Sequence, residues 1–205
     1  MNELRDGLWE WTGPHPAWKP GADWEQQVRS FAYAGREGLV LIDPLVRDSD
    51  WQRLDELAEQ HGGVAAVAVT VHWHERDAAE AARRYGAELF APALGDRPES
   101  LAGAREISHG DGLPGGIEAV VVEPAEEALL YLPEARTLVS GDTLLAREGR
   151  LSLCPASWLE REEDLEPTRA GVARALELPL EAVAVSHGEP ALFEGRAALE
   201  QALRA

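Results

Sequence analysis

The sequence predicts an α/β fold in which two mixed β-sheets pack face to face, with helices on their outer faces. Two observations lead to this prediction. Apolar, β-branched runs alternate with amphipathic helical segments, and the order of strands, helix, strand and helix occurs in both halves of the chain. Each half also ends in a continuous apolar run, at residues 64–71 and 182–186, which is typical of a strand buried on both faces. Such strands need covering layers on both sides.

Length and composition favour one globular domain over residues 1–205, because 205 residues of which 45% are apolar can bury a sizeable core. No apolar run approaches the roughly 18 residues of a membrane span, and the first residues lack the pattern of a signal peptide. The single cysteine, Cys154, excludes an internal disulfide and fits a reducing cytosol, so we expect a cytoplasmic protein. A net charge of −18 would repel nucleic acid and anionic membranes, which leaves a small-molecule substrate as the expected partner.

The first half of the chain begins with an aromatic segment. Residues 6–18 carry three tryptophans and predict a short strand followed by an irregular loop, whose indole rings either cover a core edge or wall a substrate pocket. Residues 28–34 and 38–46 predict two strands joined by a tight turn. A helix over residues 50–61, the buried strand 64–71, a helix over 78–85 and a short strand at 88–91 follow.

The second half begins with a stretch rich in glycine and proline at residues 93–116, which either links two halves or arches over a site. Residues 117–122, 128–132 and 137–140 predict three short strands, and residues 151–158 are extended or looped. Residues 162–176 predict a helix whose stable part starts at Pro167. The buried strand 182–186 and an amphipathic helix over 195–204 complete the chain.

Side chains that can bind metal follow three separate apolar strands. They are His72 and His74 after the first buried strand, Asp142 after residues 137–140, and His187 after the last strand. Alternation along an extended chain would aim both histidines of H-W-H at one point beyond the sheet edge and turn Trp73 away from them, toward the core or a pocket wall. A single strand end with such a side chain is common, and the side chain then usually faces solvent in a loop. Three such strand ends in one chain indicate a shared zinc or iron site.

The order of these motifs resembles that of the metallo-β-lactamase-fold hydrolases, from about residue 28 to residue 190. The likeness is carried by L-V-L-I-D-P at 39–44, T-V-H-W-H-E-R-D at 70–77, Y-L-P-E-A-R-T-L-V-S-G-D at 131–142 and V-S-H-G at 185–188. The resemblance implies an αββα sandwich with one or two metals at an edge of the sheets. It implies His72 and His74 as ligands of the first metal, Asp142 as a bridging ligand, His187 as the last ligand, and Asp43 as a support for the metal loop.

The chain departs from the family's H-x-H-x-D-H signature, since Arg76 and Asp77 stand where the family has Asp and His. A guanidinium cannot coordinate a cation, because it stays protonated. Arg76 would therefore place positive charge where the second metal sits, or pair with Asp142 or Asp77. This change favours one metal over two.

The histidine that the family supplies between these motifs is also missing. Counting back from Asp142 by the family's usual interval indicates Glu123 as the substitute oxygen ligand, with Glu126 as a near rival. A looser alignment leaves the position open. His109 would either reach the pocket from its loop or face solvent.

We therefore expect a metal-dependent hydrolase with one zinc ion, for which iron and manganese are alternatives, acting on an ester, thioester or lactone. Zinc would lower the pKa of a bound water to roughly 7, with Asp77 orienting or deprotonating that water. Arg76 would bind an anionic group, stabilise oxyanion charge, or form a structural ion pair. The alternative hypothesis is a catalytically degenerate member, with or without metal, that binds a ligand or a protein. Iron-dependent redox chemistry is a third and weaker one.

Overall fold

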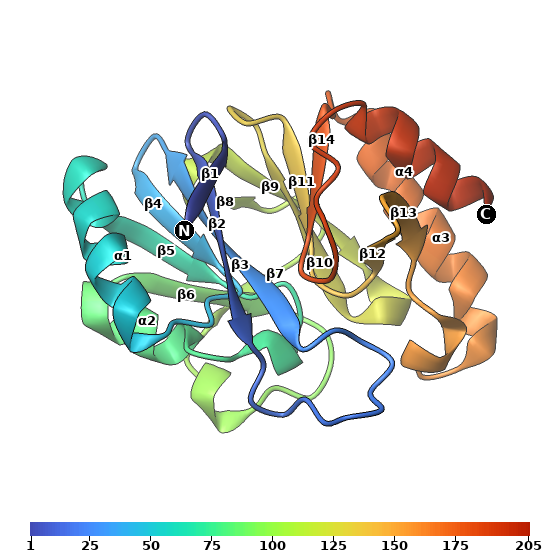
Figure 1. Ribbon diagram of the computed structural model, residues 1–205, viewed down its shortest axis with the longest axis horizontal. Coiled ribbons are helices and arrows are strands. Elements are labelled where there is room, and N and C mark those ends of the chain that lie inside the picture. The colour runs from blue at the N-terminus through green and yellow to red at the C-terminus, as the bar shows by residue number, and fades with distance from the viewer.

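Two sheets lie face to face between two pairs of helices in the computed structural model, which describes residues 1–205 (Figure 1). The first sheet contains seven strands in chain order, antiparallel from β1 to β4 and parallel from β4 to β7. Its strands are β1 (Asn2–Arg5), β2 (Leu8–Pro14), β3 (Gln27–Gly35), β4 (Gly38–Ile42), β5 (Val64–Ala68), β6 (Glu88–Pro92) and β7 (Arg105–Ile107).

The second sheet has the strand order β14-β11-β10-β9-β8, in which only β11 and β14 run parallel. A separate two-stranded ribbon, β12 (Leu144–Arg147) with β13 (Arg150–Leu153), follows the loop after β11. The strands of the second sheet are β8 (Gly112–Leu113), β9 (Ile117–Val122), β10 (Glu127–Leu132), β11 (Thr137–Ser140) and β14 (Ala182–Val185).

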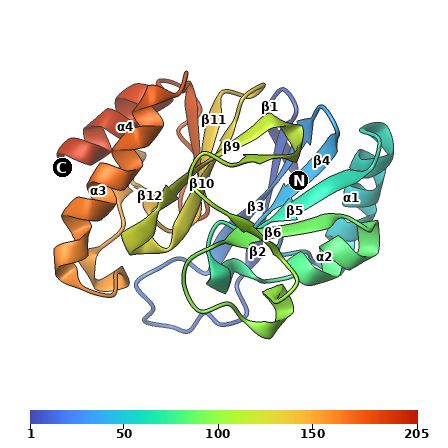
Figure 2. The same ribbon diagram turned by 180° about the vertical axis from the view of Figure 1, so that it is seen from behind.

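Helices α1 (Asp48–Gln60) and α2 (Ala78–Tyr85) cover the outer face of the first sheet, and α3 (Leu165–Ala173) and α4 (Gly195–Arg204) cover that of the second (Figures 1 and 2). None of them combines the length and apolar character of a membrane-crossing helix. Short 3-10 turns connect the elements: η1 (His72–His74), η2 (Glu99–Leu101), η3 (Pro114–Gly116), η4 (Glu123–Ala125), η5 (Ala156–Trp158), η6 (Glu162–Asp164) and η7 (Arg174–Glu177).

The layers follow from strands that are apolar on both faces. In β10, Leu130 belongs to the apolar cluster between the sheets, whereas its neighbour Leu129 packs with Val172 of α3 and Leu199 of α4. In β4, Val40 likewise faces the second sheet, and Leu41 faces the helices on the other side. Successive side chains of a strand point to opposite faces, so each continuous apolar run holds two layers together. The predicted αββα sandwich is confirmed.

Several element boundaries differ from the predictions for local reasons. The predicted strand 64–71 ends at Ala68, and residues 72–74 form the η1 turn, in which the backbone N–H of His74 donates to the carbonyl of Val71. The predicted helix 162–176 is divided into η6, α3 and η7, and α3 begins at Leu165 rather than at Pro167. Proline is tolerated there because N–H groups in the first helical turn have no partner within the helix.

Candidate metal centre

Three loops from both sheets bring one side chain each to a common point. His74 comes from the segment after β5, Asp142 from the loop after β11, and His187 from the loop after β14. The Nε2 atoms of His74 and His187 lie 3.2 Å and 3.1 Å from Oδ1 of Asp142. The three donor atoms lie within 4.8 Å of one another. That these three residues meet agrees with the prediction from their strand-end positions.

This donor set fits one divalent cation. Asp142 Oδ1 is buried without a hydrogen-bond donor, although two imidazole nitrogens lie close to it. A cation bound at this point, or a proton on Nε2 of His74, would give that oxygen a partner. Two imidazoles and one carboxylate are the ligand types of catalytic zinc sites, in which three protein ligands leave a position open.

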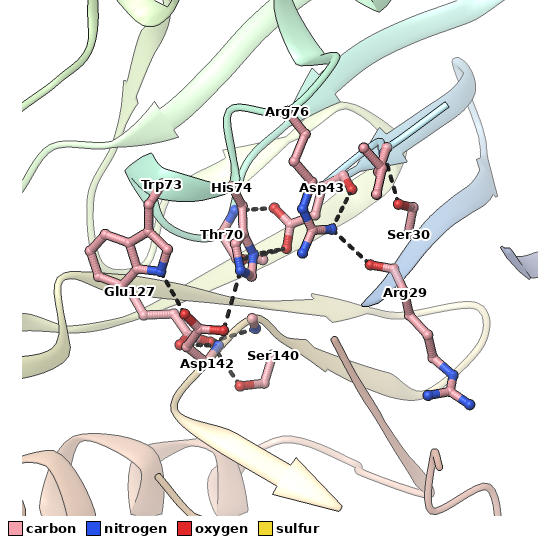
Figure 3. A network of polar contacts seen from close by, with 12 residues as sticks. Arg29, Ser30, Asp43, Thr70, Trp73, His74, Arg76, Glu127, Ser140 and Asp142 are labelled. Atoms are coloured by element: carbon pink, nitrogen blue, oxygen red, sulfur yellow. Dashed lines mark hydrogen bonds and ion pairs between the residues drawn. The ribbon is translucent and has the colours of Figure 1, made fainter. Parts of the chain in front are cut away.

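Asp43 orients the His74 ring through its Nδ1 atom, while Nε2 faces Asp142 (Figure 3). The Nδ1–H of His74 donates to Oδ2 of Asp43 at 2.9 Å, and the Thr70 hydroxyl donates to the same oxygen at 2.6 Å. The backbone N–H of Thr70 donates to the other oxygen at 2.7 Å. A carboxylate bound to one imidazole nitrogen fixes the tautomer and leaves Nε2 available to a cation. Asp43 therefore has the supporting position that the resemblance implied.

Charges in this buried cluster shift the pKa values of its members. Burial and the Arg76 charge lower the pKa of His74, but Asp142 and Asp43 outweigh them and raise it to about 9. Burial raises the pKa of Asp142, whereas His74 and His187 hold it well below the ordinary value. Without a cation, His74 is thus protonated between two carboxylates. A bound cation would replace that proton.

Glu127 at the start of β10 holds the Asp142 loop and was not anticipated from the sequence. Its buried carboxylate accepts the backbone N–H groups of Gly141, Asp142 and Thr143 at 2.8, 2.9 and 2.6 Å. It also accepts the hydroxyls of Ser140 and Thr143 at 2.7 and 2.5 Å. The only signal was an acidic residue at the start of an apolar run in E-P-A-E-E, where two other glutamates compete with it.

Glycine is required next to Asp142 because two loops approach closely there. A Cβ on Gly141 would collide with the Thr70 hydroxyl and lie 3.3 Å from the His74 ring. The backbone N–H of Ala128 also donates to the Thr70 carbonyl at 2.9 Å, which ties the end of the first sheet to β10. The S-G-D sequence at the end of β11 thus allows His74 and Asp142 to meet.

His72 lies outside the cluster, so the prediction that both histidines face one point is wrong. Its Nε2 lies 2.8 Å from the carbonyl oxygen of Pro92. The reason is the η1 turn: at three residues per turn, positions i and i+2 diverge by about 120°, whereas in a strand they are parallel. Trp73 is half-exposed for the same reason, and its Nε1–H donates to Oδ2 of Asp142 at 2.5 Å.

Glu123 and its rivals are placed elsewhere. Glu123, proposed as the substitute ligand, forms an exposed ion pair with Arg174 at 3.1 Å. The Glu126 carboxylate lies against Gly95 near His72, and His109 is exposed. The interval counted back from Asp142 fails because Glu123 begins the η4 turn, which packs against α3, and its side chain pairs with Arg174 rather than with the donors.

Arg76 and Asp77 also differ from their predicted roles. Asp77 does not line the cavity; its Oδ2 accepts the backbone N–H of Val46 at 2.6 Å and holds the loop after β4. Arg76 has a left-handed backbone with φ of 34°, and its Nη1–H groups donate to the carbonyls of Arg29 and Asp43, both at 2.9 Å. It forms no ion pair with Asp142 or Asp77, because backbone oxygens hold its Nη1 instead.

A cavity of about 480 Å³ opens over the three donors. Its walls include Trp24, Trp73 and Trp158, and the ring centroids of Trp24 and Trp158 lie 5.7 and 5.9 Å from that of His187. Trp24 lies outside the predicted aromatic segment 6–18. Within that segment His15 and Ala17 line the cavity. Trp9 and Trp11 instead pack in the core under α1 and α2, so these two indole rings have the core-covering role of the two that were predicted. Cys154 also lines the cavity, and burial raises the pKa of its thiol to about 12.

Comparisons with known proteins agree on the fold. The family model of the metallo-beta-lactamase superfamily matches residues 17–204. Among solved structures, DIM-1 metallo-beta-lactamase has 12% identity and a TM-score of 0.73, over 98% of this chain and 94% of its own. A metallo-beta-lactamase from Pontibacter korlensis has 18% identity and a TM-score of 0.68, over 99% and 97%. A metallo-beta-lactamase family protein from Thermus thermophilus has 17% identity and a TM-score of 0.67, over 98% and 79%. No curated protein matches the chain significantly.

Proposed function

Because this chain belongs to the metallo-beta-lactamase superfamily, we propose that it is a metal-dependent hydrolase that holds a single ion with His74, Asp142 and His187. Membership of the superfamily by itself suggests metal-dependent hydrolysis. The single ion, its identity as zinc and the substrate class are the finer parts of the proposal. The observation that carries the proposed ion site is the convergence of three donor atoms within 4.8 Å beside a cavity that their residues help to line.

One ion rather than two is supported by what surrounds the donors. Arg76 occupies the signature position at which the family supplies an acidic ligand, and it is permanently cationic. His72 is hydrogen-bonded to Pro92 and so does not contribute to a second set of ligands. The remaining donors, two imidazoles and one carboxylate, suffice for one ion with an open position.

An ion of this kind supplies a hydroxide at neutral pH and polarises a carbonyl group. The protein residues provide the rest of the site. Asp43 keeps the Nδ1 proton of His74 in place, and Glu127 holds the backbone on both sides of Asp142. The backbone N–H of Ala17 donates to Nδ1 of His15, so the His15 proton stays on Nε2 at the cavity wall, available to a substrate oxygen. Burial lowers the pKa of His15, which keeps this imidazole neutral.

The cavity supports a small-molecule substrate with an ester, thioester or lactone bond. Its volume of about 480 Å³ lies within the roughly 300–1,000 Å³ of small-molecule sites. The indole walls suit an apolar body next to the bond that is cleaved.

Metal analysis of protein purified without chelator tests the proposal. We expect about one zinc, iron or manganese per chain, and His187→Ala is expected to retain less than about 0.2 per chain. His109→Ala, which removes an exposed histidine, is the matched control and keeps the wild-type content. Wild-type protein that stays below about 0.2 ions per chain after soaking with each metal would refute the proposal.

Arg76 also supports a second candidate, a catalytically degenerate member that uses the cavity to bind a ligand. A guanidinium in place of an acidic ligand is what the loss of one metal position would leave behind. The two candidates differ in one measurement. If hydrolysis of an activated ester is abolished in His187→Ala while the circular dichroism spectrum is unchanged, the binding-only candidate is excluded.

A further inference from the structure

The Arg76 guanidinium has one hydrogen-bonding edge in use and one free. Nη1 donates to two backbone carbonyls, those of Arg29 and Asp43. Nε and Nη2 are buried without any hydrogen-bond partner. Burial lowers the pKa of Arg76, and the carboxylates of Asp43 and Asp142 act on it only through space. A buried N–H without an acceptor is unfavourable, and more so when it carries positive charge.

The free edge has a definite chemical preference. Nε–H and Nη2–H of a guanidinium are parallel and form the side-on fork that binds the two oxygens of a carboxylate. Nη1 anchors this fork to the backbone beside the Asp43–His74 pair (Figure 3). The backbone of Arg76 is left-handed, with φ of 34°, which is unfavourable for a residue with a Cβ.

The cavity over the three metal donors includes Arg76 in its wall. Arg76 is the only arginine or lysine among the lining residues, and three indoles and several small apolar side chains make up most of the rest. Asp23 and Asp142 are the acidic residues of the lining. The chain as a whole is strongly acidic, with a net charge of −18.

We propose that the Nε/Nη2 edge of Arg76 binds a carboxylate of the substrate, so that the substrate is a small carboxylic acid with an apolar or aromatic body. The inference rests on the proposed function, because it names the substrate class of the same cavity. The carboxylate lies against Arg76, the apolar body lies against the indoles, and the bond that is cleaved lies over His74, Asp142 and His187.

Binding of a matched pair of ligands tests this assignment without any catalytic readout. The probes are 3-phenylpropionate and its neutral amide, 3-phenylpropanamide, titrated by calorimetry and by tryptophan fluorescence. Wild-type protein is expected to bind the acid at least about 10-fold more tightly than the amide, as a charge-assisted bidentate contact provides. Equal affinities, or no binding of either ligand at about 10 mM, would overturn the assignment.

Three variants test whether the preference for the acid comes from Arg76. Arg76→Gln is expected to reduce the preference for the acid to less than about 2-fold, and Arg76→Lys to keep part of it, because lysine keeps the charge but not the fork. Arg161→Gln removes an exposed arginine near η5 and is expected to leave the preference unchanged. An unchanged preference in Arg76→Gln contradicts the proposal. If that variant does not fold, the proposal is judged on the wild-type pair and on Arg76→Lys, where a full preference contradicts it.

Two further titration series complete the experiment. One separates the effect of Arg76 from that of a bound ion, and the other compares a carboxylate ligand with a phosphate ligand. The titrations are repeated after chelator treatment, where a preference due to Arg76 persists and one due to a bound ion disappears. Phenyl phosphate replaces the acid in a third series, and tighter binding of phosphate than of carboxylate would overturn the choice of carboxylate. Absence of metal or of hydrolysis would refute the proposed function but would leave the acid preference in place.

Discussion

The Glu127 carboxylate accepts the backbone N–H of Asp142 at 2.9 Å, and Asp142 in turn places its Oδ1 between the imidazoles of His74 and His187. A residue at the start of β10 thus determines the position of a donor that follows β11. The buried Glu127 carboxylate aligns the backbone N–H groups of Asp142 and Thr143. Metal ligands commonly need support of this type from neighbouring residues.

Glu127→Gln is expected to misplace the Asp142 loop. The amide nitrogen of glutamine would face N–H and O–H donors that now point at a carboxylate oxygen, and buried donors would lose their acceptor. We expect the free energy of unfolding to fall by about 2–4 kcal/mol and zinc affinity to fall about 10- to 100-fold. Urea denaturation and chelator competition measure the two effects.

Glu123→Gln is the matched control for that variant. It changes a glutamate of the same segment whose carboxylate is mostly exposed and paired only with Arg174. An exposed ion pair of this kind contributes about 0–1 kcal/mol, and zinc affinity is expected to stay at the wild-type value. Equal losses in both variants would contradict the role assigned to Glu127.

Asp43→Asn is expected to weaken metal binding without removing a ligand. The Oδ1 of asparagine can still accept the Thr70 N–H. Its amide nitrogen would then replace the oxygen that now accepts both the His74 Nδ1–H and the Thr70 hydroxyl, and an amide nitrogen cannot accept either of them. We expect a loss of about 10- to 100-fold in zinc affinity. Asp55→Asn, which changes a carboxylate paired with Arg84 on the surface, serves as the control. Unchanged affinity in Asp43→Asn would show that His74 is oriented by other contacts.

The two histidines of H-W-H are expected to respond differently to substitution. His74→Gln removes a donor of the cluster, and the metal content is expected to fall below about 0.2 per chain. His72→Gln replaces a side chain that faces the Pro92 carbonyl, and its metal content is expected to remain near the wild-type value. Elemental analysis of both variants checks this. Loss of metal from His72→Gln at unchanged fold would mean that the η1 turn rearranges when metal binds.

Stability of the chelated protein is expected to depend on pH through His74. Burial and Arg76 lower the pKa of His74, but Asp142 and Asp43 raise it overall from 6.5 to about 9. The folded pKa exceeds the unfolded one, so the stabilisation is complete below about pH 6.5 and is lost as the pH rises toward 9. Urea denaturation at pH 6, 7.5 and 9, compared with His74→Gln, measures the effect. A wild-type profile as flat as that of the variant would contradict it.

Much of the fold could be predicted because burial leaves a periodic trace in the sequence. The bounds of α2 and α4, at residues 78–85 and 195–204, coincide with the predicted ranges, and β9 and β11 also do. The sequences of β5 and β14 are apolar at every position, so both faces of these strands must be buried. This requirement predicted the αββα order of layers. That His74, Asp142 and His187 meet was also predictable, because each follows a buried strand.

The sequence alone determined the elements, their layers and the chemistry of the three donors, since these depend on local periodicity and residue type. Only the tertiary structure decided that His72 turns to Pro92, that Glu127 rather than Glu123 serves the site, and that Arg76 keeps one edge free. Each of these depends on a partner in a distant segment. The pairing of strands within each sheet places that partner, with β5 beside β4 and β6, and β10 beside β11, and no pattern within a single segment records it.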